Sequence, residues 1–510
     1  MLFLSLIFFL SAMVDAQPFR YTRAVFNEVD TLKNVEFARA EWLNNPISLL
    51  SDYNIHEGEA ITENRPLYMD IFLPRGDTLT QRPAVIFVHG GAFLVGSRHN
   101  DDMVAFCDSF ARRGYVTATI DYRRGMGATV YRFFGIMTGI SVNETNAQRA
   151  VYRATQDGRA AVGYLRKNAG LYGIDSAKIF MVGSSAGAFV SLNNLYLDQS
   201  EEIPPAAMNK PSLEGLDFIG FPEYKSKADA VAALWGAIAN LSLIENESIP
   251  VLLIHGKDDN IVPFAKGVPL EGSVPPNPFI QFSLPETYGS YCIDTALNNK
   301  GIYHETWFPD NKKHEFYGVD TGEFPPEGPN QYWDTIHNKI EKFLLERFQP
   351  DAGFEIAVRG KQLTVTSLST DNHYIKWDFG DGNTGTGEQT DHIYQYTGKY
   401  TVTLTVCNAN MACDTMSKTV TILNTAASND ISSDAGDIRI YPNPAAGKIY
   451  ISGIQVPFEV TVYDVAGRKR INKCMAQEKI LYISRLPRGI YFLEIQSRGT
   501  SVFRKIIKTD

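Results

Sequence analysis

The feature that most constrains the fold is an alternation of short β-rich runs with helical stretches between Tyr21 and Phe348. The β-rich runs read AVIFVHGG, YVTATIDY, KIFMVGSS, AVAALWGA, PVLLIHGK and YHETWF. One intervening segment, ATQDGRAAVGYLRKNAGLYG, has helical spacing and stops at Gly173. Strands that alternate with helices build parallel sheets, whose apolar strands are buried on both faces. We therefore predict an α/β fold with a doubly wound, mostly parallel sheet over residues 17–350.

The pattern changes after Pro350. Residues 400–406, YTVTLTV, alternate apolar side chains with threonines, which is typical of a half-buried antiparallel strand. We predict a small all-β sandwich over 351–423, and then a linker over 424–437, where small polar residues cannot bury a core. Strand-like runs return after it and predict a second small all-β sandwich over 438–510.

The N-terminal segment and the net charge bear on export and on binding partners. Residues 1–16 hold an apolar run too short to span a bilayer comfortably, followed by small residues, and they predict a secretory signal cleaved after Ala16. An N-terminal membrane anchor is the alternative. The formal charge is −9, and no cluster of Lys and Arg offers a phosphate-binding surface. We therefore expect no nucleic-acid partner.

The chain has five cysteines, too few for a disulfide framework in 510 residues. Cys407 and Cys413 flank a turn, and such close cysteines are expected to pair in an exported protein. Cys107, Cys292 and Cys474 stay unassigned. Because no cysteine or histidine pair has ligand spacing in a compact cluster, we expect no metal site.

A serine stands where a β-rich run gives way to a helical stretch. The run Ile179–Val182 leads into Gly-Ser-Ser-Ala-Gly, with Ser185 at its centre. A strand-to-helix turn of this kind holds a nucleophile in strained geometry, and flanking glycines avoid collisions there. We predict that Ser185 is a nucleophile. The alternative is a hydroxyl at a tight turn.

A serine nucleophile needs a base and an orienting carboxylate, and both follow in the chain. Asp259 comes just past the strand PVLLIHGK, with Asp258 interpreted as a solvated turn residue. His314 lies in a loop after YHETWF, whereas His304 lies inside that strand. We predict Asp259 as the acid and His314 as the base; a surface hydrogen-bonding role is the alternative for either histidine. The order Ser, Asp, His is that of α/β-hydrolases.

Backbone amides must meet the oxyanion of an acyl-transfer intermediate. The amide of Ala186, next after the serine, is one expected donor. The others are expected from VHGGAF, where glycines follow a strand and allow close approach of the backbone. We predict that the amides of Gly91 and Ala92 point at the oxyanion.

These segments together resemble a known family. RPAVIFVHGGAF, RGYVTATIDYR, YGIDSAKIFMVGSSAGA and HGKDDNIVP are similar to the carboxylesterase and hormone-sensitive-lipase-like branch of the α/β-hydrolases. The resemblance implies Ser185 as nucleophile, Asp259 as acid and His314 as base, with no cofactor. The chain departs from the family pattern at Ala92, which replaces a third glycine, and at KKHEF, which lacks the family's glycine before the histidine.

The later domains resemble families as well. WDFGDG, HIYQY and GKYTVTLTV are similar to a polycystic-kidney-disease (PKD) type sandwich. YPNPAAGKIYI, VYDVAGRKR, LPRGIYFLEI and FRKIIKTD resemble the C-terminal sorting domain of the type IX secretion system of Bacteroidota. That resemblance implies contact with the secretion machinery, export across the outer membrane, and a product that is released or attached to surface lipopolysaccharide.

The leading hypothesis is a secreted serine carboxylic-ester hydrolase that works through an acyl-enzyme. A serine peptidase on the same fold and a catalytically inactive surface adhesion protein are the alternatives. Export and an accessory sandwich suggest an extracellular, polymeric ester, such as an acylated polysaccharide, a feruloyl ester or a polyester. Residues 196–230 and 265–300, rich in Pro, Tyr and Phe, are expected to border the acyl and alcohol pockets.

Overall fold

A computed structural model describes residues 20–245, 249–271, 279–319, 321–423, 438–454, 457–475, 479–497 and 500–509. The predicted signal peptide and the predicted linker lie outside the described residues. The chain forms two compact units. The first comprises the residues up to Pro350 together with Cys407–Asp414, and the second comprises Asp351–Val406 and Thr415–Asp510. In the described part of the chain, no helix is long and apolar enough to cross a membrane.

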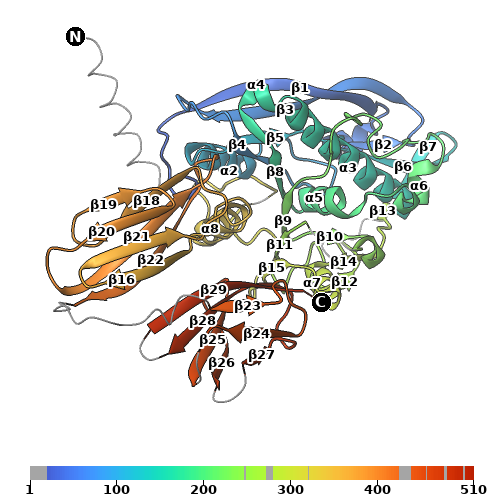
Figure 1. Ribbon diagram of the computed structural model, residues 1–510. Helices are drawn as coiled ribbons and strands as arrows, with labels where there is room; N and C mark the ends of the chain where they lie inside the picture. Colours follow the sequence, from blue (N-terminus) through green and yellow to red (C-terminus); the bar gives the residue numbers. More distant parts are fainter. Residues whose placement is uncertain are drawn as a thin grey trace, which may run out of the picture. The chain divides into compact units, whose positions relative to one another are not determined.

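The first unit contains the three residues predicted to be catalytic and is called the catalytic unit below. It is built on an eight-stranded sheet (Figure 1). Its first two pairings, β1 with β3 and β3 with β5, are antiparallel, and all the others are parallel. The predicted mostly parallel sheet is therefore confirmed. In spatial order the strands are β1 (Val29–Leu43), β3 (Thr62–Pro74), β5 (Val116–Ile120), β4 (Arg82–Val88), β8 (Ile174–Ser184), β9 (Ala230–Leu234), β11 (Val251–Ile254) and β15 (His304–Trp307).

Helices cover both faces of this sheet. Along β4, Ala84, Ile86 and Val88 belong to one apolar core, whereas Val85 and Phe87 belong to the other. The first core also takes side chains from α3 (Glu144–Lys167), α5 (Ala186–Tyr196) and α7 (Ser290–Lys300), and the second from α2 (Asp101–Arg112) and α8 (Tyr332–Leu345). Because adjacent residues of one strand face opposite sides, the all-apolar sequence of β4 follows directly from this double cover.

The helical stretch predicted to stop at Gly173 does so. Helix α3 begins at an Asn143 cap and is followed by the short helix α4 (Ala169–Tyr172). Gly173 ends it with φ of 63°, a left-handed conformation in which glycine is favoured. The remaining short helices of this unit are η2 (Ser48–Tyr53), η3 (Ser200–Glu202), α6 (Pro205–Met208) and η4 (Leu241–Leu243).

Two smaller sheets complete the catalytic unit. A four-stranded sheet, called the small sheet below, has the order β13 (Ile280–Phe282), β7 (Ile136–Val142), β6 (Met126–Phe133) and β2 (Ile55–Glu57). A three-stranded sheet has the order β10 (Ala237–Ile238), β14 (Thr287–Gly289) and β12 (Lys266–Gly267).

The second unit is all-β, as predicted, and its described strands form pairs of small sheets. The first pair consists of β16 (Phe354–Arg359), β17 (Gln362–Ser367) and β20 (Gln389–Ile393), and of β19 (Thr384–Thr386), β18 (Tyr374–Asp378), β21 (Gly398–Cys407) and β22 (Cys413–Ile422). In β21, Val402, Leu404 and Val406 are fully buried, which confirms the alternation expected of 400–406. The second pair consists of β23 (Arg439–Tyr441), β24 (Lys448–Ser452) and β27 (Ile480–Tyr482), and of β26 (Lys469–Met475), β25 (Phe458–Asp464), β28 (Gly489–Ser497) and β29 (Thr500–Lys508).

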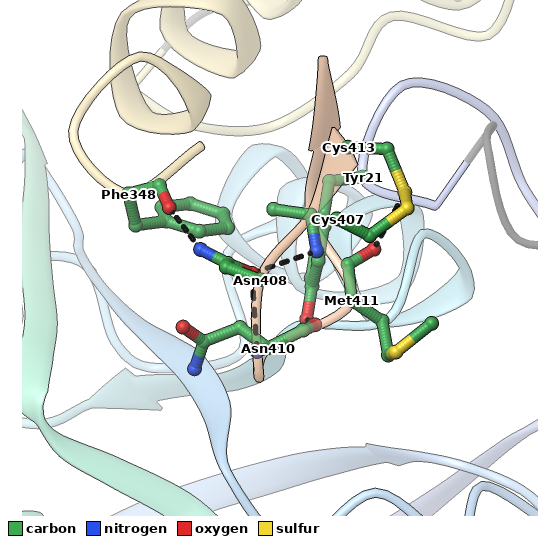
Figure 2. The surroundings of a disulfide bond; sticks show 8 residues. Tyr21, Phe348, Cys407, Asn408, Asn410, Met411 and Cys413 are labelled. Carbon is green, nitrogen blue, oxygen red and sulfur yellow. Dashed lines mark hydrogen bonds between the residues drawn. A yellow bond between two sulfur atoms is a disulfide. The ribbon is translucent and has the colours of Figure 1, made fainter. Parts of the chain in front are cut away.

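Cys407 and Cys413 form the expected disulfide (Figure 2). The loop that they close belongs to the catalytic unit. There the Tyr21 hydroxyl donates to the backbone carbonyl of Asn410 at 2.7 Å, and the side-chain Nδ2 of Asn410 donates to the backbone carbonyl of Gln81 at 2.7 Å. The other three cysteines are free.

Candidate active site

The strand β8 delivers Ser185 into a sharp turn. Ser185 has φ of 53° and ψ of −117°, and α5 begins at the next residue. A Cβ at Gly187 would lie 2.1 Å from the Val88 carbonyl oxygen, so only glycine fits between the turn and β4. This is the strained strand-to-helix geometry that the sequence predicts around Ser185.

The structure brings Ser185, His314 and Asp259 together. His314 Nε2 lies 2.9 Å from Ser185 Oγ, and His314 Nδ1 lies 2.7 Å from Asp259 Oδ2. A carboxylate oxygen only accepts, so Nδ1 carries the proton and Nε2 is left to accept from the serine hydroxyl. Ser185 is only 6 % exposed, but it lines two cavities, which a bound molecule could enter to reach it.

The residues set aside in the sequence lie outside this chain of hydrogen bonds. Asp258 is exposed. His304 lies in β15, where its Nε2 is 2.7 Å from Asp294 Oδ1. The hydrogen bonds therefore distinguish Asp259 from Asp258, and His314 from His304.

The loop after β4 faces the serine. Gly91 has φ of 106°, and a Cβ there would lie 2.3 Å from the Val95 carbonyl oxygen. Ala92 also adopts a left-handed φ, of 53°. Gly91, Ala92, Ser185 and His314 line the same cavity. Among the described residues, the amides of Gly91 and Ala92 donate to no protein acceptor, which leaves them able to bind an oxyanion.

His89 supports this loop from below. It is fully buried, and its Nδ1 lies 2.7 Å from the Gly90 carbonyl oxygen, so Nδ1 carries the proton. Its ring stacks on Tyr122 with centroids 4.3 Å apart, and the Tyr122 hydroxyl lies 3.2 Å from the His89 and Gly90 carbonyl oxygens. Burial lowers the pKa of His89 to about 4, which keeps it neutral at ordinary pH.

A second histidine, which no pattern in the sequence singled out, contacts Asp259. His255 is fully buried, and its Nε2 lies 3.1 Å from both Asp259 Oδ2 and the Val262 carbonyl oxygen. Both partners accept, so Nε2 carries a proton. The amides of Ile261 and Val262 donate to Asp259 Oδ1 at 2.8 and 2.9 Å. Burial acts to raise the pKa of Asp259, but the hydrogen bonds from His255 and His314 hold it well below its usual value.

A buried network lies beneath the turn. Trp235 Nε1 donates to Ser184 Oγ at 3.0 Å, and the Tyr317 hydroxyl donates to Asp102 Oδ2 at 2.7 Å. Asp102 is fully buried, and burial raises its pKa to about 8, although the hydrogen bond from Tyr317 lowers it. The raised pKa favours the protonated form of this carboxyl near neutral pH. No signal in the sequence joins Asp102 to Tyr317, because the pairing is made only by the fold.

Two cavities meet at Ser185. The first chamber, of about 460 Å³, is largely apolar, and side chains from α5, the 196–230 segment and the 265–300 segment line it, including Phe189, Leu197, Ile203 and Leu284. The second chamber, of about 760 Å³, is the one that His314 lines. Residues of both expected border segments therefore line the site. Among the described residues, no three His, Cys, Asp or Glu side chains are grouped so that they could hold a metal ion.

The fold and the family comparisons define the class. The catalytic unit has an α/β-hydrolase fold, and the BD-FAE family model matches residues 69–131 and 137–212 of it. The PKD domain model matches residues 352–423, and the secretion system C-terminal sorting domain model matches residues 439–509. The three resemblances stated from the sequence are therefore confirmed. The sorting domain indicates type IX export to the cell surface or the extracellular space.

Curated proteins match parts of the chain. A neuroligin-like protein, glit-1, of Caenorhabditis elegans is 32% identical over 124 residues, covering 24% of this chain and 15% of that protein. The bile salt-activated lipase of Homo sapiens is 30% identical over 137 residues, covering 25% of this chain and 17% of that protein. The chain thus spans less than a third of the length of these relatives.

A solved structure of Thermogutta terrifontis esterase 2 phosphorylated by paraoxon has 19% sequence identity and a TM-score of 0.38. The match covers 55% of this chain and 89% of that protein.

Proposed function

We propose that this protein is a secreted carboxylesterase that works through Ser185, His314 and Asp259. The observation that carries the proposal is the continuous hydrogen-bonded chain from Ser185 Oγ through the His314 ring to Asp259, facing the amides of Gly91 and Ala92. A serine hydroxyl with a neutral imidazole acceptor and a buried orienting carboxylate is the arrangement that activates it for attack on a carbonyl.

The reaction follows from the positions of these groups. Ser185 Oγ attacks the ester carbonyl while His314 Nε2 takes its proton. The oxyanion that forms accepts hydrogen bonds from the amides of Gly91, Ala92 and Ala186. His314 then returns the proton to the alcohol oxygen, the ester bond breaks, and the acyl group stays on Ser185. Water, deprotonated by His314, releases the acid and restores the enzyme.

The two chambers divide the substrate between them. The leaving alcohol must lie beside His314 Nε2, because that atom gives it the proton. His314 lines the second chamber and not the first. We therefore assign the alcohol portion to the second chamber and the acyl group to the first. The apolar walls of the first chamber favour an aliphatic or aromatic acyl group over a charged one.

The C-terminal sorting domain bears on where the proposed enzyme acts. The sorting domain is expected to engage the type IX secretion machinery, and attachment to surface lipopolysaccharide is one fate of the exported product. An extracellular ester fits this setting, and acylated polysaccharide, feruloyl esters and polyesters are the polymeric forms to be tested.

A substrate panel tests the function. We expect hydrolysis of 4-nitrophenyl esters, with rates that depend on acyl length, and little hydrolysis of the matching aminoacyl amides. Amide cleavage without ester cleavage would instead favour a peptidase. No hydrolysis of either, together with no reaction toward a phosphonate, would favour an inactive adhesion protein.

A further inference from the structure

The hairpin formed by β6 and β7 is seen in Figure 1. It carries a group of exposed apolar side chains that the proposed catalytic mechanism does not use. We call this group the hairpin tip. Its members are Tyr131 (54 % exposed), Phe133 (67 %), Phe134 (90 %), Ile136 (71 %) and Met137 (38 %). Phe133 pairs with Ile136 across the hairpin, and its ring lies 4.6 Å from that of Phe134, so these three side chains are neighbours. Single exposed apolar residues are common, but neighbouring ones mark an interaction site.

The turn of this hairpin has an unfavourable backbone conformation. Phe134 and Gly135 have φ of 47° and 77°, so both central residues of the turn are left-handed. Asparagine, aspartate or glycine are the residues that suit the first of these positions, and a bulky side chain there is an outlier. The ring of Phe134 makes an edge contact with the ring of Phe133, with centroids 4.6 Å apart, but Phe134 is the most exposed residue of the tip, so this contact buries little of it. A strained, solvent-facing phenyl group points to a role outside the fold.

The small sheet connects the hairpin tip to both chambers. Met126, at the start of β6, lines the first chamber. On β13, which pairs with β7, Ile280 lines the second chamber and Phe282 lines both. One small sheet thus carries walls of the substrate cavity and the exposed apolar tip.

The charges near the hairpin tip limit the kinds of surface to which it can bind. Arg132 is the one charged residue between Met126 and Val142, and it forms an ion pair with Glu57. The hairpin therefore has no cation with which to attract anionic headgroups, and the net charge of the chain, −9, opposes a negatively charged surface. The Tyr131 hydroxyl is the one polar side-chain group among the five tip residues, so the tip offers few of the hydrogen bonds with which a polysaccharide is bound.

We propose that the hairpin tip inserts into the surface of an emulsified neutral lipid ester and holds the catalytic unit there. This inference rests on the proposed esterase function. A projecting two-residue turn can enter a fluid apolar phase, whereas it would meet a solid polymer at one point only. A second copy of the chain fits less well, because stable dimer interfaces use about 20–30 residues a side and the tip offers five.

Adsorption of inactive variants to a lipid emulsion tests the proposal independently of catalysis. Flotation with a gum-stabilised triolein emulsion compares Ser185→Ala with Ser185→Ala carrying Phe134→Ser and Ile136→Ser. Losing the transfer of two large apolar groups should weaken adsorption by about tenfold or more. The matched control carries Leu171→Ser and Phe218→Ser, which remove exposed apolar groups that line neither chamber, and it should adsorb like the parent.

Activity separates this inference from the proposed function. With Ser185 intact, the tip variant should lose about tenfold or more on tributyrin above its solubility limit, yet hydrolyse soluble 4-nitrophenyl acetate like the native enzyme. Equal adsorption of tip variant and parent overturns the proposal. Adsorption to xylan or to a polyester film, but not to triolein, would also overturn it. A dimer that forms with native protein but not with the tip variant would overturn it as well. If native enzyme floats with triolein through the tip but hydrolyses no soluble ester, the proposed function fails and the docking role stands.

Discussion

The eight-stranded sheet and the small sheet both contribute to the chambers at Ser185, but they contribute different chemistry. Polar side chains follow β8, β11 and β15, and each is fixed by hydrogen bonds: His314 to Asp259, and Asp259 to His255 and two amides. The small sheet contributes apolar side chains such as Met126 and Phe282. The first sheet is covered on both faces, whereas the hairpin of the second ends in exposed phenyl groups.

Under the proposed function, this difference separates the groups that carry out the reaction from those that select the substrate. Side chains fixed by directional hydrogen bonds in a buried site serve every ester alike. Apolar walls contribute in proportion to the surface they cover, so their effect depends on which acyl group is bound. Changes on the first sheet should therefore lower all rates together, and changes at the chamber walls or hairpin tip should reorder substrates.

The largest expected effect is on the acid and the base. Asp259→Asn should lower kcat by about 10⁴-fold, because an amide no longer selects the tautomer with Nε2 free to accept. Asp258→Asn, a change at the neighbouring exposed carboxylate, is the matched control and should leave kcat near that of native enzyme. His314→Ala, paired with His304→Ala, extends the test to the base. Steady-state rates on short and long acyl esters measure both pairs, and unequal losses between substrates would break the comparison.

A smaller, substrate-independent effect is expected at His255, which we interpret as a positioning residue for Asp259. His255→Leu removes a hydrogen bond to a buried carboxylate and should lower kcat by about 10- to 100-fold, with KM little changed. In His255→Gln the amide can replace Nε2–H and should restore much of the rate. If both variants lose the same activity, the role of His255 is packing rather than orientation of Asp259.

A substrate-dependent effect is expected in the first chamber. Ile203→Trp fills part of its volume, so kcat/KM for an octanoyl ester should fall by about tenfold relative to an acetyl ester. Val319→Trp, in the second chamber, should instead discriminate among alcohols of different size. Exchange of these two outcomes would reverse the assignment of acyl and alcohol sides.

The smallest effect on rate is expected at Asp102, where stability is the measurement. Its pKa in the folded protein, about 8, lies above that of an unfolded aspartate. As pH rises, the unfolded state therefore releases this proton before the folded state does. The stability that the protonated Asp102 contributes is complete below about pH 4. Between there and about pH 8, it is lost by up to about 1.4 kcal/mol per pH unit. Asp102→Asn removes this loss. Denaturant unfolding should show the variant gaining on native protein between about pH 5 and about pH 8; a constant difference would contradict the protonated form.

Much of the catalytic sheet could be predicted because its evidence is local. The turn at Ser185 and the positions of Asp259 and His314 after strands follow from residues adjacent in the chain. The contact of His255 with Asp259 had a weaker signal, a histidine four positions before the acid at a strand end. The pairing of Asp102 with Tyr317 had none, because the two residues are 215 positions apart.

The small sheet, and the place of the disulfide loop in the catalytic unit, escaped prediction for related reasons. Strands β6 and β7 interrupt the strand and helix alternation of the main sheet, so the period that predicts the fold does not include them. The loop between Cys407 and Cys413 was expected to pair its cysteines, but its place in the catalytic unit depends on contacts with Tyr21 and Gln81, far away in the sequence.

The central claim, that Ser185 is the nucleophile, is tested most directly by covalent labelling. Native protein, Ser185→Ala and Ser184→Ala are each incubated with a fluorophosphonate, and the intact mass and labelled peptide are measured. Ser184 is the matched control, because its hydroxyl is fully buried and accepts a hydrogen bond from Trp235. We predict one adduct on Ser185 in native protein and in Ser184→Ala, and none in Ser185→Ala. An unlabelled native protein, or an adduct that persists in Ser185→Ala, would contradict the claim.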